Sequence, residues 1–218
     1  MSRPEVSIRD LTRADVPRAA EVLARAFTTN PGIVAIFSDV SDTDRIPVLE
    51  RLYRRLIEAC ILGAVARGAF VQDELVGAQL AYEPGQFPLS GSANWLMLKG
   101  LWEAGPRYVH RLVIADALLR GRHISTPHCY LFMLGVDPAQ QGRGFGGALL
   151  RDFNERARRL GVDAYLETDR TSAYALYRHD GYRTLREEVF GLQGYVRTWF
   201  MLKPLAALQA HGAATGAA

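Results

Sequence analysis

Four glycines lie within six positions, in the segment Gln141-Gly142-Arg143-Gly144-Phe145-Gly146-Gly147. The segment follows an almost unbroken apolar run and precedes a helical pattern, so we expect a turn between a strand and a helix. Backbone N–H groups at a helix start have no partner within the helix and point toward a bound anion, which glycines allow to come close. The segment therefore predicts a phosphate-binding turn, with a merely tight turn as the alternative.

Two known phosphate-binding patterns can be compared with this turn. Gly142, Gly144 and Gly147 satisfy G-x-G-x-x-G, and Glu167 follows about twenty residues later, as in nicotinamide-dependent oxidoreductases. Against that assignment, Asp137-Pro138-Ala139-Gln140-Gln141 separates the strand from the first glycine, and only about seventy residues remain for a doubly wound sheet. The Walker pattern is absent because no Gly-Lys-Ser/Thr follows. The oxidoreductase stays as an alternative hypothesis.

Three titratable side chains lie at the ends of expected strands and are candidates for a general base. Glu83 ends a hairpin strand, Glu167 ends the strand after the glycine-rich turn, and His128 begins the strand before it. Each could reach a cleft beside the sheet, although a surface or structural role explains each of them too. Cys60 and Cys129, the only cysteines, match no zinc or redox spacing, so we expect no metal site.

The periodicity of the chain predicts an α/β protein throughout. The expected elements are a strand over 6–11, helices over 15–27 and 44–67, hairpin strands over 69–72 and 76–82, a strand over 128–136, a helix over 147–160, a strand over 164–167, a helix over 173–180 and strands over 182–190 and 195–202. The stretch Thr28-Thr29-Asn30-Pro31-Gly32 should end the first helix, and Gly68 the second. Residues 84–127 are interpreted as an insertion of one or two helices.

Length and composition favour one ordinary globular domain. We assign residues 1–204 to it and expect 205–218 to be a disordered tail, since the chain beyond Pro204 is mostly Ala, Gly and Leu. A formal charge of +3 spread over 218 residues argues against a nucleic acid partner. No apolar run is long enough to span a bilayer and the N-terminal residues do not resemble a secretory signal, so a cytoplasmic protein is expected.

Two motifs resemble the GCN5-related N-acetyltransferase family. Gln141-x-x-Gly144-x-Gly146, after Gly135-Val136-Asp137-Pro138, resembles motif A, whose amides hold the pyrophosphate of acetyl-CoA. Leu176-Tyr177 with Gly181-Tyr182 resembles the L-Y-x-x-x-G-F signature of the same family. Within the family, the Leu-Glu-Thr stretch at 166–168 and the Thr-Trp-x-Met stretch at 198–201 look most like the puromycin N-acetyltransferase group. The likeness covers the C-terminal half well and the N-terminal half only in outline.

The resemblance implies a fold, a co-substrate and a set of binding residues. The fold would be a mixed, mostly antiparallel sheet of about seven strands, splayed between strands 4 and 5, flanked by helices and carrying a helical insertion between strands 3 and 4. The co-substrate would be acetyl-CoA. The implied binding residues are Leu134, Gly135, Val136, Gln141, Gly142, Arg143, Gly144, Phe145, Gly146, Gly147, Arg170, Ala173, Tyr174 and Tyr177. Arg170 departs from the family, in which many members have Asn at this position.

The implied reaction is direct attack of an amine on the thioester. Backbone groups of Leu134 and Val136 would hold the thioester, Tyr177 would protonate the departing thiolate, and Glu167 or Glu83 would be the catalytic base. The acceptor would be a primary amine of a small molecule. A protein or peptide amine, and acetyl-CoA binding without transfer, are the alternatives. A homodimer formed through the final strands is a further possibility.

Aromatic side chains of the less similar regions could line an acceptor pocket, although core packing explains them equally well. They are Phe27, Phe37, Tyr53, Tyr82, Trp95 and Trp102.

Overall fold

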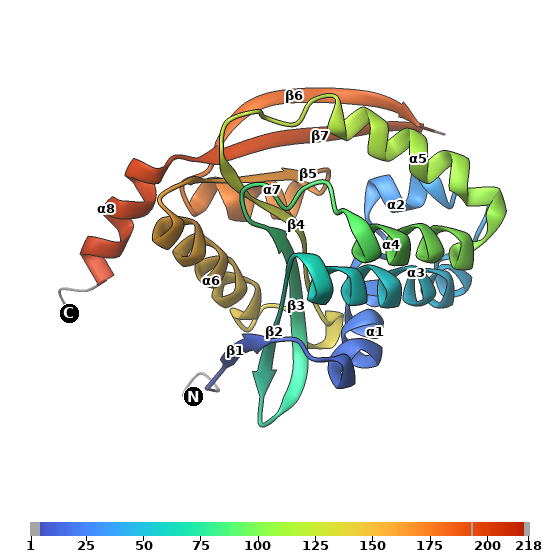
Figure 1. Cartoon of the computed structure of the whole chain (residues 1–218), viewed down its shortest axis with the longest axis horizontal. Helices are drawn as coiled ribbons and strands as arrows, with labels where there is room; N and C mark the ends of the chain where they lie inside the picture. The colour runs from blue at the N-terminus through green and yellow to red at the C-terminus, as the bar shows by residue number, and fades with distance from the viewer. Residues whose placement is uncertain (1–4, 193, 216–218) are drawn as a thin grey trace.

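The chain folds around one sheet of seven strands (Figure 1). The computed structural model describes residues 5–192 and 194–215. The strands are β1 (Ser7–Asp10), β2 (Val65–Val71), β3 (Glu74–Tyr82), β4 (His128–Val136), β5 (Asp163–Thr168), β6 (Arg183–Leu192) and β7 (Gly194–Lys203). Their order is β1-β2-β3-β4-β5-β7-β6, antiparallel throughout except between β4 and β5. The expected mixed, mostly antiparallel sheet is confirmed.

Helices cover both faces of this sheet. They are α1 (Val16–Phe27), α2 (Pro31–Ile36), α3 (Asp42–Gly63), α4 (Gly91–Ala104), α5 (Pro106–Arg120), α6 (Phe145–Leu160), α7 (Thr171–His179) and α8 (Leu205–Thr215). On one face α1 and α3 pack together, with α4 outside α3, while α6 packs on the other face with α8 beside it (Figure 1). None of the helices within the described residues has both the length and the apolar character to cross a membrane.

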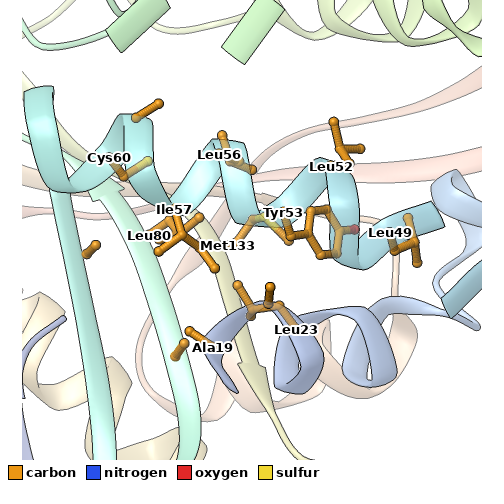
Figure 2. Packing of buried hydrophobic residues seen from close by; sticks show 14 of the residues in the cluster. Ala19, Leu23, Leu49, Leu52, Tyr53, Leu56, Ile57, Cys60, Leu80 and Met133 are labelled. Carbon is orange, nitrogen blue, oxygen red and sulfur yellow. The ribbon is translucent and has the colours of Figure 1, made fainter. Parts of the chain in front are cut away.

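The larger core lies between the sheet and the pair α1 and α3. Leu23 of α1 and Leu49 and Ile57 of α3 are fully buried and face each other across the helix pair (Figure 2). These positions recur at helical spacing, so each helix presents one apolar stripe, and complete burial of such a side chain stabilises the fold by roughly 1.5–3 kcal/mol. The packed helices fix the position of α1 beside β4, the strand that leads to the glycine-rich turn.

A bulge in β4 separates it from β5. Leu80 of β3 pairs with Met133 and Ala81 pairs with Leu131, so Phe132 is an extra residue without a partner on β3. Pairing between β4 and β5 ends at Leu131, whereas β5 continues beside β7 to its own end. A gap therefore opens between the carboxyl ends of β4 and β5, and the expected splay between these strands is confirmed.

Several boundaries differ from those expected. The second long helix ends at Gly63 instead of Arg67, because Val65 to Gly68 pair with β1 and β3 as the start of β2. The hairpin turn is at Gln72-Asp73, whose positive φ angles of 50° and 63° suit a tight two-residue connection. The insertion forms the helices α4 and α5, as expected.

Two short helices were missed. Asn30 caps α2 by accepting a hydrogen bond from the Ile33 amide, and Pro31 occupies the first helical position, so the Asn-Pro-Gly stretch starts a helix besides ending one. Beyond Pro204, the helix α8 replaces the expected disordered tail. Its Leu208 is buried against the α6 side of the sheet. Residues 216–218 lie outside the described residues.

Candidate active site

The glycine-rich turn presents a row of unpaired backbone amides. Gly142 and Gly144 have φ angles of +77° and +89°, which side-chain-bearing residues rarely adopt, and a Cβ on Gly142 would meet no atom within 4 Å. In the part of the chain that the structure describes, no protein acceptor receives the N–H groups of residues 142–147, and the first helical bond there runs from Ala148 to Gly144. These amides are therefore free to bind an anion.

Two arginines accompany the turn. A Cβ on Gly147 would lie 3.4 Å from Nη1 of Arg151, so this guanidinium lies against the first turn of α6. Arg143 donates to Oε1 of Gln140 and lies 5.3 Å from the ring centre of Phe145. Within the described residues neither arginine has a carboxylate partner. Sequence reasoning missed Arg151, although its position four residues after Gly147 places it on the same side of the helix.

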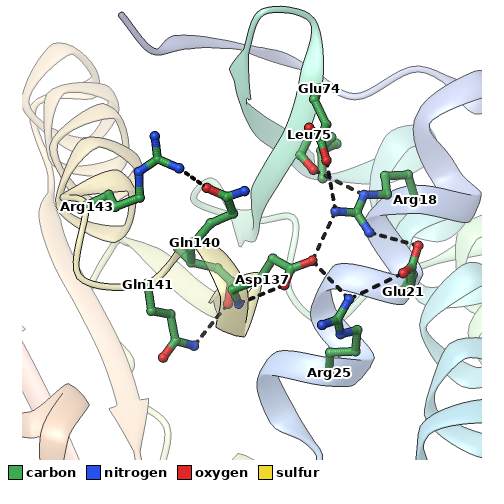
Figure 3. A network of polar contacts seen from close by, with 11 residues as sticks. Arg18, Glu21, Arg25, Glu74, Leu75, Asp137, Gln140, Gln141 and Arg143 are labelled. Atoms are coloured by element: carbon green, nitrogen blue, oxygen red, sulfur yellow. Dashed lines mark hydrogen bonds and ion pairs between the residues drawn. The ribbon is translucent and has the colours of Figure 1, made fainter. Parts of the chain in front are cut away.

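A buried carboxylate holds the start of the turn. Oδ1 of Asp137 accepts the Ala139 amide at 3.0 Å, and Oδ2 lies 3.0 Å from Arg18 and 3.4 Å from Arg25 (Figure 3). The Asp137 side chain is 3% exposed. Because both arginines belong to α1, this network connects the turn to the helix pair on the opposite face, and sequence reasoning did not identify it.

The Gln141 side chain and the β4 backbone define the opening between the strands. The Asp137 amide donates to Val76 of β3, and because peptide groups alternate along a strand, those of Val136 and Leu134 face the other side, where β5 has left β4. Nε2 of Gln141 donates to the Val136 carbonyl at 3.1 Å. The Leu134 peptide faces the opening, so part of the expected main-chain surface is present.

One cavity of about 460 Å³ joins most of the predicted site residues. It extends from the glycine-rich turn along β4 to the end of β5 and to α7. Among the predicted residues it is lined by Leu134, Gly135, Val136, Gln141, Gly142, Gly144, Phe145, Gly146, Gly147, Glu167, Arg170, Ala173 and Tyr177. Arg143 and Tyr174 do not line it; Tyr174 stacks on Trp199 and hydrogen-bonds Thr184.

Tyr177 and Glu167 line this cavity from two different elements, α7 and β5. Tyr177 of α7 is 7% exposed, its hydroxyl has no hydrogen-bond partner among the described residues, and burial raises its pKa above the ordinary value. Glu167 at the end of β5 accepts hydrogen bonds from the hydroxyls of Tyr165 at 2.8 Å and Tyr130 at 3.3 Å. The site thus contains a protonated phenol and a carboxyl group with ordered donors.

The other base candidates lie elsewhere. Glu83 is paired with Arg156 of α6 and, like His128, lines a separate cavity of about 290 Å³. Arg170 lines the larger cavity, but its guanidinium donates to Thr29 at 3.0 Å, toward the segment between α1 and α2. The structure therefore brings Glu167, and not Glu83, to the cavity that contains Tyr177.

The predicted aromatic residues do not form one pocket. Phe27 lines the large cavity and packs edge-on against buried Tyr53, while Tyr82 lines the smaller cavity. Phe37 is buried against Tyr108. The remaining two, Trp95 and Trp102, are 68% and 66% exposed on α4.

Two further side chains near Glu167 had no clear sequence signal. Nδ1 of His123 lies 3.5 Å from Oε1 of Glu167, although His123 belongs to the insertion and is far away in the chain. Asp169 accepts hydrogen bonds from Asn30 and from the Gly32 amide, both at 2.6 Å, and its burial raises its pKa. Asp169 thereby joins the end of β5 to the start of α2.

Comparison with known proteins gives short sequence matches. The chain is 37% identical over 81 residues to mycothiol acetyltransferase of Clavibacter sepedonicus, covering 34% of this chain and 27% of that protein. It is 46% identical over 65 residues to N-alpha-acetyltransferase RimI of Mycobacterium tuberculosis, covering 28% and 40%. The matches thus span less than half the length of these relatives.

Solved structures match over most of the chain. A histone acetyltransferase HPA2 and related acetyltransferase of Corynebacterium glutamicum superposes with a TM-score of 0.60 at 24% identity, covering 91% of this chain and 96% of that one. The PaiA N-acetyltransferase of Thermoplasma acidophilum, solved in complex with coenzyme A, has a TM-score of 0.56 at 14% identity, covering 92% and 99%. These similarities show the same fold.

A family profile shows to which family the chain belongs. The likeness to the puromycin N-acetyltransferase group within that family stays a prediction. The profile of the acetyltransferase (GNAT) family matches residues 34–182, which is more than half of the chain and includes β4, the glycine-rich turn and Tyr177. The chain therefore belongs to the acetyltransferase (GNAT) family.

Proposed function

We propose that this protein transfers the acetyl group of acetyl-CoA to a primary amine of a small molecule. The observation that carries the proposal is the row of unpaired amides at residues 142–147, beside Arg143 and Arg151 and at one end of the cavity that contains Tyr177. Dipolar N–H groups and two guanidinium groups suit a diphosphate, and a nearby phenol suits a departing thiolate.

The residues that line the cavity suit coenzyme A. The turn would hold the diphosphate, and the Leu134 peptide at the opening between β4 and β5 would pair with the pantetheine arm and orient the acyl carbonyl. Bound acetyl-CoA supplies an activated thioester. Gly142 and Gly146 leave the main chain accessible, since a Cβ on either would meet no neighbour closer than 3.7 Å.

Glu167 and Tyr177 are assigned the proton transfers. Glu167 would take the proton from the attacking nitrogen, because its carboxyl group lies at the cavity and is oriented by two tyrosine hydroxyls. Tyr177 would donate to the thiolate, because burial keeps its phenol protonated at neutral pH. Glu83 is the weaker candidate, since Arg156 occupies its carboxylate.

A small primary amine is the favoured acceptor. Glu167 and Asp169 both line the cavity, and a carboxyl group there would attract a cationic amine, while Phe27 offers an apolar contact. The match with the RimI protein supports a second candidate, the α-amino group of a peptide.

A thiol-release assay with acetyl-CoA tests the proposal. The panel should include arylalkylamines, polyamines, amino sugars and peptides with a free N-terminus. We expect release that depends on one amine class and that falls by roughly 10²–10⁴-fold in Glu167→Gln, since the amide cannot accept the proton. Calorimetry with acetyl-CoA should show binding by both proteins. Binding without transfer to any amine would favour the acetyl-CoA-binding alternative, and stabilisation by NAD alone would favour the oxidoreductase.

A further inference from the structure

A chain of polar contacts runs from Glu167 to the smaller cavity. Oε1 of Glu167 lies 3.5 Å from Nδ1 of His123, and Nε2 of His123 lies 3.0 Å from Nε2 of His128. Nδ1 of His128 lies 2.7 Å from the Thr126 carbonyl oxygen. The contacts join the end of β5 to the segment between α5 and the start of β4, which lies far from β5 in sequence.

The Thr126 carbonyl determines which ring nitrogens of His128 and His123 carry a hydrogen. A carbonyl oxygen only accepts, so Nδ1 of His128 carries a hydrogen. Burial lowers the pKa of His128, which favours the neutral ring, and Nε2 of that ring then has a lone pair. Nε2 of His123 must therefore donate to it. A neutral His123 then presents the unprotonated Nδ1 to the carboxyl group of Glu167.

We propose that His123 is the second acceptor of the substrate proton and that His128 is a positioning residue that fixes the His123 tautomer. The inference rests on the proposed function, because Glu167 is the base in that function. The lone pair of Nδ1 and the carboxyl group of Glu167 face each other across 3.5 Å, so one proton can pass between them.

The proton transfers balance without another reactant. A protonated amine loses its proton to Glu167, and the free nitrogen attacks the acyl carbon as the carbon–sulfur bond breaks. Glu167 passes the proton to Nδ1 of His123, which becomes an imidazolium while Nε2 still donates to His128. Solvent in the smaller cavity then takes the proton, and Glu167 is a carboxylate again. The nitrogen loses its second proton after the attack. By way of solvent, that proton replaces the one that Tyr177 gives to the departing thiolate, so the net release is one proton.

The surroundings of His123 suit this role. Its ring centre lies 4.7–5.0 Å from those of Phe87, Tyr130 and Tyr165, so three aromatic rings restrict its orientation and can stabilise an imidazolium. His123 also lines the cavity of about 290 Å³, through which solvent can reach it. The titratable and charged groups acting on this network are Glu167, Tyr130, Tyr165, His128, Asp163 and Arg186.

Nitrogen NMR of the imidazole rings in the full chain tests the geometry without any activity measurement. We expect the Nδ1–H tautomer for His128 and the Nε2–H tautomer for neutral His123, assigned with His123→Gln and His128→Gln. In His128→Gln the His123 ring should lose its single tautomer. A neutral His123 with hydrogen on Nδ1 in the wild type would overturn the inference.

Kinetics with the active amine test the role. His123→Gln should lower kcat by roughly 10–100-fold, remove the step that follows imidazole titration from the pH profile of kcat, and leave acetyl-CoA affinity unchanged. Added imidazole should partly restore His123→Ala. His110→Gln, an exposed histidine of α5, is the matched control and should behave as the wild type.

The two proposals fail differently. Absence of transfer by the wild type with every amine overturns the proposed function. If the wild type transfers the acetyl group and His123→Gln does so with the same rate and pH profile, the proton relay is overturned and the proposed function stands. Because Glu167 and His123 act on the same proton, Glu167→Gln combined with His123→Gln should be no slower than Glu167→Gln.

Discussion

Replacing Asp137 by Asn should weaken both the fold and the binding of acetyl-CoA. The amide keeps the size of the side chain and the oxygen that accepts from Ala139. Its NH₂ group, however, faces Arg18 and Arg25 and cannot accept the hydrogen bonds that they donate. The substitution therefore removes two charge-assisted contacts and places the N–H donors of the amide against two guanidinium groups.

The size of the effect follows from burial. Hydrogen bonds to charged groups contribute about 1.5–3 kcal/mol each, and water replaces part of that here because the arginine side chains are 31% and 39% exposed. We expect a loss of about 2 kcal/mol in the free energy of unfolding, or a decrease in Tm of about 4–8 °C for a chain of this length. If about 1.4 kcal/mol of this loss comes from the contacts that hold the glycine-rich turn in its binding conformation, the affinity for acetyl-CoA falls about tenfold.

Calorimetric unfolding and acetyl-CoA titration measure the two effects. Glu21→Gln is the matched control, since Glu21 pairs with the same arginines but does not contact the turn, and its Tm and Kd should stay near those of the wild type. An unchanged Kd in Asp137→Asn together with a lowered Tm would refute the claim that this network positions the turn. An unchanged Tm would refute the energetic estimate itself.

Four further substitutions test separate parts of the structure. Tyr177→Phe should slow turnover by roughly 10²–10⁴-fold with little change in acetyl-CoA affinity. An unchanged kcat of this variant in steady-state kinetics would contradict the role of Tyr177 as the acid. Gly144→Ala should raise the Kd for acetyl-CoA about tenfold in calorimetry, because a left-handed conformation costs alanine about 1–2 kcal/mol. The hydrogen bonds from Arg9 lower the pKa of Asp15 to about 2, so the stability that Asp15 contributes is present above pH 3.8 and lost as pH falls through about 2. Acid unfolding of Asp15→Asn should show a weaker pH dependence in that window. Leu208→Ala should lower the free energy of unfolding by about 2 kcal/mol in denaturant titration, whereas a tail that packs on nothing would give no change.

The sequence predicts the elements whose residues are apolar in an unambiguous pattern. The limits of β4 are correct at both ends because the run from His128 to Val136 is apolar and bounded by prolines. The end of α3 is wrong because apolar residues continue from the helix into β2, and only the pairing with β3 separates them. The helix α8 was missed because a stretch of mostly Ala and Gly is typical of a tail as well as of a helix. Of residues 205–210, whose burial the structure describes, only Leu208 is buried by tertiary contact.

The candidate site is predictable only where its residues are adjacent in sequence. The amides of residues 142–147 follow from the glycine pattern, since local backbone geometry creates the site. The contact between His123 and Glu167 depends on how the insertion folds back over β4, and no spacing within the insertion encodes it. Asp137 is part of the motif, but its arginine partners belong to a helix more than a hundred residues earlier.

The bulge at Phe132 has a consequence for how variants of this strand should be made. Because one face of a strand alternates with the other, a single extra residue exchanges the facing of every later position. It turns Gly135 toward α1, where a Cβ would lie 2.9 Å from Leu23, and turns the Val136 side chain toward α6. Deleting position 132 would leave composition and hydropathy almost unchanged. It would nevertheless turn Gly135 away from α1, so the number of residues in this strand matters more for its packing than their types.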